Sequence, residues 1–254
     1  GTVAVEILED LPDVDAVFIP IGGGGLASGL GYHLKKHAPQ VMCYGVEPEG
    51  AASMQAAMAN NAPIELAHIN KFVDGAAVKK IGALTFDIAS QVLDSVKSIP
   101  EGKICTTILE LYNKDAIVAE PAGALAIAAL AFHKDEIKGK KVVCIVSGGN
   151  NDIDRMSEIK EMSLLYEGFK HYFIVRFPQR PGALRLFVSE VLGPKDDITR
   201  FEFIKKTERE RGPALVGIEL NNPADYAAVI DRMKTNKFDF IEINKDQTLF
   251  EYLV

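Results

Sequence analysis

Short apolar runs alternate with longer stretches of helical periodicity through residues 1–165. Runs at 15–21, 41–46 and 141–146 are rich in β-branched and other apolar residues, which is typical of strands buried in a parallel sheet. A shorter run at 95–99 predicts a further strand. Helical periodicity extends from the glycines at 22–25 to about residue 37, and recurs at 51–60, 84–94, 102–114, 121–133 and 154–164. This alternation predicts a doubly wound α/β layer with a parallel sheet.

The rhythm changes after Gly168. Strand-like alternation is present at 171–177, 197–205, 214–220 and 238–243, and helical patterns are present at 183–192 and 224–235. The resulting order is β-α-β-β-α-β, which is the split βαβ arrangement of ferredoxin-like domains. We therefore predict a small ferredoxin-like domain after the α/β layer.

Composition changes near the same point. Residues 1–167 carry 14 Lys/Arg against 22 Asp/Glu, whereas residues 168–254 carry 14 against 13. Aromatic residues shift as well, because 12 of the 20 Phe and Tyr follow residue 167. We therefore predict two domains, 1–167 and 168–254. The net charge of −7 argues against a nucleic-acid partner, and no apolar run approaches the length of a membrane span.

The three cysteines, Cys43, Cys105 and Cys144, are far apart and form no CxxC pair. This spacing is typical of reduced thiols in a cytoplasmic protein. The chain opens at Gly1 without an initiator methionine and enters an amphipathic stretch at once. We therefore expect it to begin inside a domain.

Four successive glycines, Gly22–Gly25, follow the first predicted strand and precede a helix. Their backbone N–H groups are not screened by side chains, so the loop is expected to bind an anion at the helix N-terminus. Gly22, Gly24 and Ala27 also fit the G-x-G-x-x-A pattern of dinucleotide-binding proteins, and Glu47 ends the next strand, where a ribose-binding acid would lie. This loop alone leaves a dinucleotide and a smaller phosphorylated ligand equally open.

A second loop, 147–150, also follows a strand and begins with Ser147. Ligands of doubly wound sheets bind at the carboxyl ends of the strands, where both loops lie. A dinucleotide has no specific need for the serine, whereas a phosphorylated heteroaromatic ring can use its hydroxyl at the ring nitrogen. The pair of loops therefore favours a compact phosphorylated heteroaromatic cofactor.

Four motifs occur in the order seen in threonine dehydratases: Gly22–Leu26, Gly45–Pro48, Glu120–Ala124 and Ser147–Asn150. The opening Gly1-Thr2-Val3-Ala4 resembles that family's segment before its glycine loop, and Phe177–Leu184 resembles its ACT-like regulatory domain. The chain is thus similar, over essentially its whole length, to pyridoxal-phosphate enzymes with the tryptophan-synthase-β type of fold. The resemblance implies deamination of L-threonine to 2-oxobutanoate and ammonia, the first step of isoleucine biosynthesis.

The resemblance also implies the roles of particular residues. Gly22, Gly23, Gly24, Gly25 and Leu26 would hold the phosphate of pyridoxal 5'-phosphate, and Ser147 would hydrogen-bond its ring nitrogen. The family's Schiff-base lysine lies in an S-F-K-x-R-G-A segment, which does not occur in this chain. We expect that segment upstream of Gly1, so no catalytic residue is assigned here and the 254 residues alone are expected to be inactive.

Two possible metal sites are expected not to form. Some relatives bind a divalent cation at positions equivalent to Glu47, Ala51 and Ser53, but a serine replaces the second carboxylate here. His33 and His37 are spaced as a helical ligand pair without an evident third ligand. Glu120, which precedes Pro121, is expected to be a helix-start acid near the cofactor.

The segment Arg180-Pro181-Gly182-Ala183-Leu184 leads into a predicted helix whose free N–H groups could bind an amino-acid carboxylate. The resemblance implies isoleucine as an allosteric ligand and a homo-oligomer, dimer or tetramer, with such modules paired side by side. Two alternatives stay open at this stage. One is a stand-alone fragment that binds a branched-chain amino acid, and the other is an NAD-binding protein.

Overall fold

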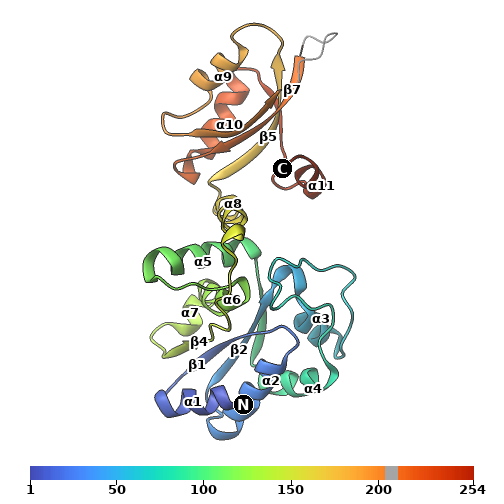
Figure 1. Ribbon diagram of the computed structural model, residues 1–254, viewed down its shortest axis with the longest axis vertical. Coiled ribbons are helices and arrows are strands. Elements are labelled where there is room, and N and C mark those ends of the chain that lie inside the picture. Colours follow the sequence, from blue (N-terminus) through green and yellow to red (C-terminus); the bar gives the residue numbers. More distant parts are fainter. Residues whose placement is uncertain (204–210) are drawn as a thin grey trace. The chain divides into compact units, whose positions relative to one another are not determined.

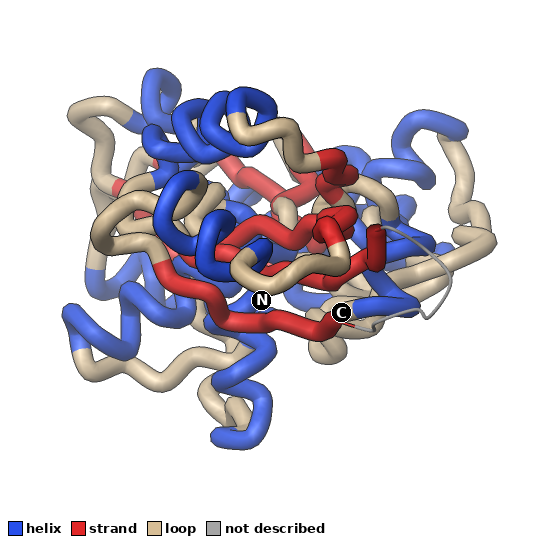
Figure 2. Tube along the Cα trace, turned by 90° about the horizontal axis from the view of Figure 1, so that it is seen from above, coloured by secondary structure: helices blue, strands red, loops and turns tan. Residues whose placement is uncertain are grey.

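The computed structural model describes residues 1–203 and 211–254, without the side chain of Gln247. The chain forms two compact units, Gly1–Ser163 and Leu164–Val254 (Figure 1). Figure 2 shows the helices and strands along the trace. Within the described ranges, no helix is long and apolar enough to cross a membrane. Each unit has its own sheet and its own hydrophobic core.

The first unit is built on a parallel sheet with the strand order β3-β2-β1-β4. The strands are β1 (Ala16–Pro20), β2 (Met42–Pro48), β3 (Ser95–Ile99) and β4 (Val142–Cys144). In the register, Val17 lies opposite Cys43 on one side and Val143 on the other. The carboxyl ends of β1 and β4 are therefore neighbours at one edge of the sheet.

Helices cover both faces of this sheet because successive strand residues point to opposite sides. Phe18 joins the core on one face with α5 (Glu101–Asp115) and α6 (Pro121–Ala129). Val17 and Ile19 join the core on the other face with α1 (Thr2–Asp10), α2 (Gly25–His37) and α4 (Ala83–Val92). The remaining helices of this part are η1 (Glu49–Ala51), α3 (Ser53–Asn60), η2 (Leu130–Phe132), α7 (Lys134–Ile137), η3 (Ile153–Arg155) and α8 (Met156–Tyr166). The predicted doubly wound layer is confirmed.

Strand β4 differs from the prediction in length and burial. The apolar run at 141–146 predicted a long buried strand, but only Val142–Cys144 pair with β1, and all three residues are half-buried. Among the described strands β4 has a neighbour on one side only. An edge position exposes backbone and side chains that a central strand would bury.

The second unit follows the predicted β-α-β-β-α-β order. Its antiparallel sheet has the order β6-β7-β5-β8. The elements are β5 (Lys170–Pro178), α9 (Ala183–Glu190), β6 (Asp197–Phe203), β7 (Arg211–Glu219), η4 (Pro223–Asp225), α10 (Tyr226–Thr235) and β8 (Asp239–Glu242). Phe187 of α9 and Met233 of α10 pack on one face. The predicted end of the second strand, at 204–205, lies outside the described residues.

The sequence pattern did not predict a final helix, α11 (Gln247–Leu253). Its residues Leu249, Phe250 and Leu253 pack against the other face of the antiparallel sheet. Asp246 caps the helix by accepting a hydrogen bond from the N–H of Leu249 at 3.0 Å. An Asp before a short apolar stretch is a start signal that could have revealed this helix.

A half-buried cluster of hydrogen-bonded side chains ties the start of this unit to its last strand. The Nδ1 atom of His171 lies 2.9 Å from the carboxylate of Glu242, and its Nε2 atom lies 3.0 Å from the carbonyl oxygen of Gly168. Tyr226 donates a hydrogen bond to the same carboxylate at 2.7 Å. These contacts, with that of His171 first, hold the pKa of Glu242 below its ordinary value.

We expect Glu242→Gln to lower the free energy of unfolding by about 1–2 kcal/mol at pH 7, because one charged acceptor serves two donors. A lowered pKa in the folded state means that this stability is present above the range where an unfolded glutamate titrates and is lost as the pH falls through the folded pKa. The difference between variant and wild type should therefore shrink in acid. Thermal unfolding from pH 7 to pH 3 measures it. Glu202→Gln, at the exposed pair with Arg200, is the control. An equal effect of the two variants would contradict the prediction.

Candidate cofactor site and regulatory pocket

The two loops singled out in the sequence meet at the carboxyl edge of the parallel sheet. Gly22–Gly25 follow β1, Ser147 follows β4, and these residues line one cavity of about 230 Å³. The sequence missed the lining residues Gly75 and Ala76, because they come from a loop without a recognisable pattern, whereas Ala122 of α6 belongs to the Glu120–Ala124 motif. The predicted neighbours Leu26 and Ser147 both line this cavity.

The glycines are required locally for different reasons. Gly24 is the N-cap of α2 with φ +86°, a left-handed conformation that favours glycine. A Cβ on Gly22 would lie 3.2 Å from the backbone of Gly75 and Ala76, so the loop packs closely there. A Cβ on Gly23 or Gly25 would meet no protein atom within 4 Å. Those two positions therefore leave open space that a bound group can occupy.

The backbone N–H groups of this loop suit an anion. Within the described part of the chain, no protein acceptor receives a hydrogen bond from the amides of Gly22–Gly25. Helix α2 has no side-chain cap and no acidic residue in its first turn. The positive end of the helix dipole and the unpaired amides thus lie together beside the open space. The residues present fit a phosphate group.

Ser147 is exposed at the cavity, and the turn that carries it is fixed by backbone contacts. The N–H of Glu120 donates to the carbonyl oxygen of Gly148 at 3.1 Å. Gly123 of α6 packs directly against the backbone of Gly148, leaving no room for a side chain. The Glu120 carboxylate lies against Gly148 and Gly75 and does not cap α6. The Glu120 side chain is therefore positioned by packing against the loop at Gly148, although the residue itself precedes the helix.

Lysine is absent from the residues that line this cavity. Lys71, Lys79 and Lys80 have exposed side chains. The lining residues therefore offer backbone hydrogen-bond donors for a phosphate and the hydroxyl of Ser147. They offer no side-chain amine.

Glu47 is fully buried and has a structural role. Its two carboxylate oxygens accept hydrogen bonds from the N–H groups of Met54 at 2.9 Å and Gln55 at 2.7 Å, at the start of α3. Burial raises the pKa of this carboxyl to about 7, although the two backbone hydrogen bonds oppose the shift. The side chain has no exposed surface, so the ribose of a dinucleotide cannot reach it.

The described residues contain no group of three or more His, Cys, Asp or Glu side chains placed to hold a metal ion. The Ser53 hydroxyl is buried without a hydrogen-bond partner among the described residues. His33 and His37 stack on each other with ring centroids 4.3 Å apart.

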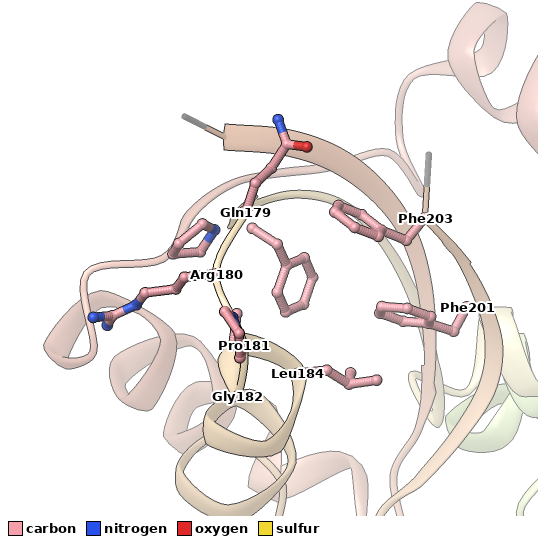
Figure 3. A pocket seen from close by; sticks show the side chains of 10 residues that line it. Gln179, Arg180, Pro181, Gly182, Leu184, Phe201 and Phe203 are labelled. Carbon is pink, nitrogen blue, oxygen red and sulfur yellow. The ribbon is translucent and has the colours of Figure 1, made fainter. Parts of the chain in front are cut away.

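A second cavity, of about 350 Å³, lies in the smaller unit between β5, β6 and the start of α9. Its apolar lining includes Phe177. Phe201, Phe203 and Leu184 also line it (Figure 3). The predicted segment Arg180–Leu184 lines the other side, and Gly182 is the N-cap of α9 with φ +86°. The Arg180 side chain extends away from the aromatic rings (Figure 3).

The sequence motifs included Phe177 but missed the other two aromatic residues of this cavity. Phe201 and Phe203 are two positions apart on β6 and therefore share one face of the strand. The aromatic enrichment after residue 167 was visible, but which rings gather near Gly182 depends on the pairing of β6 with β7.

The fold and the cavity at its glycine loop define a cofactor-binding α/β protein, and sequence comparison names the class. The chain belongs to the family of pyridoxal-phosphate dependent enzymes, which matches residues 1–148. The C-terminal regulatory domain of threonine dehydratase matches residues 161–253. The predicted resemblance is confirmed, and pyridoxal phosphate is the family's cofactor.

Similar proteins carry both parts. L-threonine dehydratase biosynthetic IlvA of Bacillus subtilis is 58% identical over 255 residues, covering 100% of this chain and 60% of that protein. The protein of the same name from Halalkalibacterium halodurans is 56% identical, covering 100% of this chain and 61% of that protein. The chain thus spans about 60% of the length of these relatives.

Solved structures agree on the fold. The processed form of threonine deaminase isoform 2 from Solanum lycopersicum is 34% identical with a TM-score of 0.61, over 64% of this chain and 48% of that one. Serine racemase from Dictyostelium discoideum is 31% identical with a TM-score of 0.55, over 60% of this chain and 49% of that one.

Proposed function

We propose that residues 1–167 form the phosphate-binding side of a pyridoxal-phosphate site in an enzyme that deaminates L-threonine to 2-oxobutanoate and ammonia. We further propose that residues 168–254 form its amino-acid-sensing domain. The observation that carries the first proposal is the single cavity lined by the four-glycine loop and Ser147. The threonine dehydratases that match the whole chain support the substrate. In this proposal the enzyme acts in isoleucine biosynthesis, in the cytoplasm, as a homo-oligomer, dimer or tetramer.

Pyridoxal phosphate, when bound, supplies an electron sink for the bond broken at the amino-acid Cα. The chain's residues would bind and orient it. The amides of Gly22–Gly25 and Leu26 would donate to its phosphate, assisted by the N-terminus of α2. The Ser147 hydroxyl would donate to the ring nitrogen without placing a full negative charge there. A neutral partner tempers the electron sink and suits loss of a β-hydroxyl, where side reactions are costly.

The covalent attachment of this cofactor requires a lysine, and the lining residues include none. We therefore propose that the 254 residues alone do not turn over threonine and that a lysine-bearing segment of the same polypeptide completes the site. The test is 2-oxobutanoate release from L-threonine by the full gene product, whose intact mass is measured first. The 254-residue chain with added cofactor is assayed beside it. Release by the chain alone above that of free cofactor would contradict the lysine requirement. If the full gene product binds the cofactor but releases no 2-oxobutanoate from L-threonine, the proposed substrate is wrong.

The smaller cavity supports isoleucine as the regulatory ligand. An aliphatic side chain fits against Phe177, Phe201 and Phe203, and the N-terminus of α9 at Gly182 suits a carboxylate. If isoleucine binds one quaternary state more tightly than the other, it would increase the population of that state and so change the activity. The substrate would then change the affinity for isoleucine by the same factor. This gives the second unit a regulatory role without a catalytic group.

Leu184→Ala is expected to weaken isoleucine binding about tenfold, because the side chain lines the apolar side of the cavity. Leu186→Ala is the matched control. It is on the same helix and similarly exposed, at 37% against 42%, and does not line the cavity. Calorimetric titration with isoleucine to millimolar concentration measures both. If the wild type does not bind isoleucine, the regulatory proposal is wrong. If both variants weaken isoleucine binding equally, the ligand does not bind in this cavity.

A further inference from the structure

The four-glycine loop is held from behind by a side chain of another helix. The Thr85 hydroxyl, in the first turn of α4, donates to the carbonyl oxygen of Gly23 at 2.7 Å and lies 3.0 Å from that of Gly82. Thr85 also packs closely on Gly24. A Cβ added to Gly24 would lie 3.0 Å from the Cβ of Thr85. Thr85 does not line the cofactor cavity. Its contacts are therefore with the outer side of the loop.

A second hydroxyl fixes the next carbonyl. The Ser28 hydroxyl lies 2.7 Å from the carbonyl oxygen of Gly24, which also accepts the Ser28 N–H at 2.9 Å. The same hydroxyl lies 2.9 Å from the carbonyl oxygen of Thr85, so it links the two helices. Successive carbonyls of the loop thus have partners on the side away from the cavity.

Carbonyl direction determines amide direction. The described peptide bonds include no cis bond, and in a trans peptide the C=O and the following N–H point in opposite directions. When Thr85 holds the Gly23 carbonyl outward, the Gly24 N–H is turned to the opposite side. The Ser28 contact does the same for the Gly25 N–H. Four glycines lack side chains to restrict their backbone, so this orientation has to come from neighbouring residues.

We infer that Thr85 is a positioning residue that aims the Gly24 amide at the phosphate of the cofactor. The inference rests on the proposed cofactor site. It predicts that Thr85 contributes to recognition of the phosphate and not of the pyridine ring. A donor that is already oriented in the free protein improves affinity, because binding then loses less conformational entropy.

The test compares the affinities of the protein for pyridoxal phosphate and for pyridoxal, which lacks the phosphate. Thr85→Val removes the hydroxyl and keeps the shape. We expect it to weaken pyridoxal phosphate binding about fivefold and to leave pyridoxal binding unchanged. Thr85→Ser should restore the affinity to within about twofold, since it keeps the donor. Thr107→Val is the control, because the Thr107 hydroxyl donates to the Lys103 carbonyl within α5, away from the glycine loop.

The amide chemical shifts give a second, residue-specific readout. With inorganic phosphate, the Gly24 and Gly25 amide protons of the wild type should move downfield. In Thr85→Val the Gly24 response should be lost while the Gly25 response is retained. Should that variant fail to fold, Thr85→Ala removes the same hydroxyl without adding a group and carries the same expectation.

The outcomes separate the two ideas. A wild type that binds pyridoxal phosphate no more tightly than pyridoxal overturns the proposed phosphate site and this inference with it. A wild type that prefers pyridoxal phosphate, with Thr85→Val matching Thr107→Val in affinity and retaining the Gly24 response, overturns the role of Thr85 alone.

Discussion

Glu47→Ala is expected to lower the free energy of unfolding of the α/β unit by about 2–4 kcal/mol at pH 6. The carboxyl group is fully buried and accepts hydrogen bonds from the N–H groups of Met54 and Gln55, so its removal leaves two donors at the start of α3 without a partner. It also leaves a cavity in a packed region. Chemical denaturation followed by circular dichroism measures the change. Glu65→Ala, at an exposed position, is the control and should be close to neutral.

The same residue predicts a pH dependence. Burial raises the pKa of Glu47 to about 7 in the folded state, above the ordinary range of a glutamate. A raised folded pKa means that its contribution to stability is fully present below the unfolded pKa and is lost as the pH rises to about 7. The loss over this window amounts to roughly 3 kcal/mol.

Glu47→Gln cannot ionise and should flatten the stability profile between pH 4.5 and about 7. The variant keeps one acceptor for α3, so some stability is lost at every pH. Glu65→Gln should leave the wild-type profile unchanged, since its side chain is exposed. A Glu47→Gln profile parallel to that of the wild type would mean that Glu47 stays ionised throughout this range.

Gly25→Ala is expected to abolish tight cofactor binding without loss of stability. A Cβ at this position meets no protein atom within 4 Å, and alanine is a better helix former than glycine at the first residue of α2. The methyl group would, however, project into the space proposed for the phosphate. We expect at least a tenfold weaker affinity for pyridoxal phosphate, measured by its absorbance, with a stability change within about 0.5 kcal/mol.

Gly123→Ala is the opposite case and serves as the comparison. A Cβ at this position would overlap the backbone of Gly148, so the variant must move the turn that carries Ser147. It should lose both stability, by about 1–3 kcal/mol, and cofactor affinity. If Gly25→Ala binds the cofactor as tightly as the wild type, the phosphate lies elsewhere. If Gly25→Ala unfolds the protein, the space beside Gly25 is filled by protein atoms and is not open to a phosphate.

Several features could be predicted because they depend on local sequence. The apolar run at 16–20 is a strand whichever sheet contains it, and the alternating pattern at 171–177 is a half-buried strand for the same reason. Gly24 and Gly182 precede helices that begin as expected. The motif order led to the family that comparison confirms for residues 1–148.

Other features depended on contacts between distant residues. Glu47 could be interpreted as a ribose-binding acid or a metal ligand, and its role became clear only when α3 placed two N–H groups on its oxygens. The edge position of β4 follows from strand order, which the run at 141–146 does not encode. Helix α11 is short, and its apolar residues gain their partners from Tyr172 and Leu215 of the sheet.

The sequence by itself determined the two-part organisation of strands and helices and the loops at Gly22–Gly25 and Ser147, because periodicity and glycine content act over a few residues. Only the tertiary structure decided that these loops share one cavity and that Thr85 lies behind the glycines. It also gathered Phe177, Phe201 and Phe203 beside Gly182. Those arrangements depend on which strands become neighbours, and that choice is made by burial of the whole core rather than by any single segment.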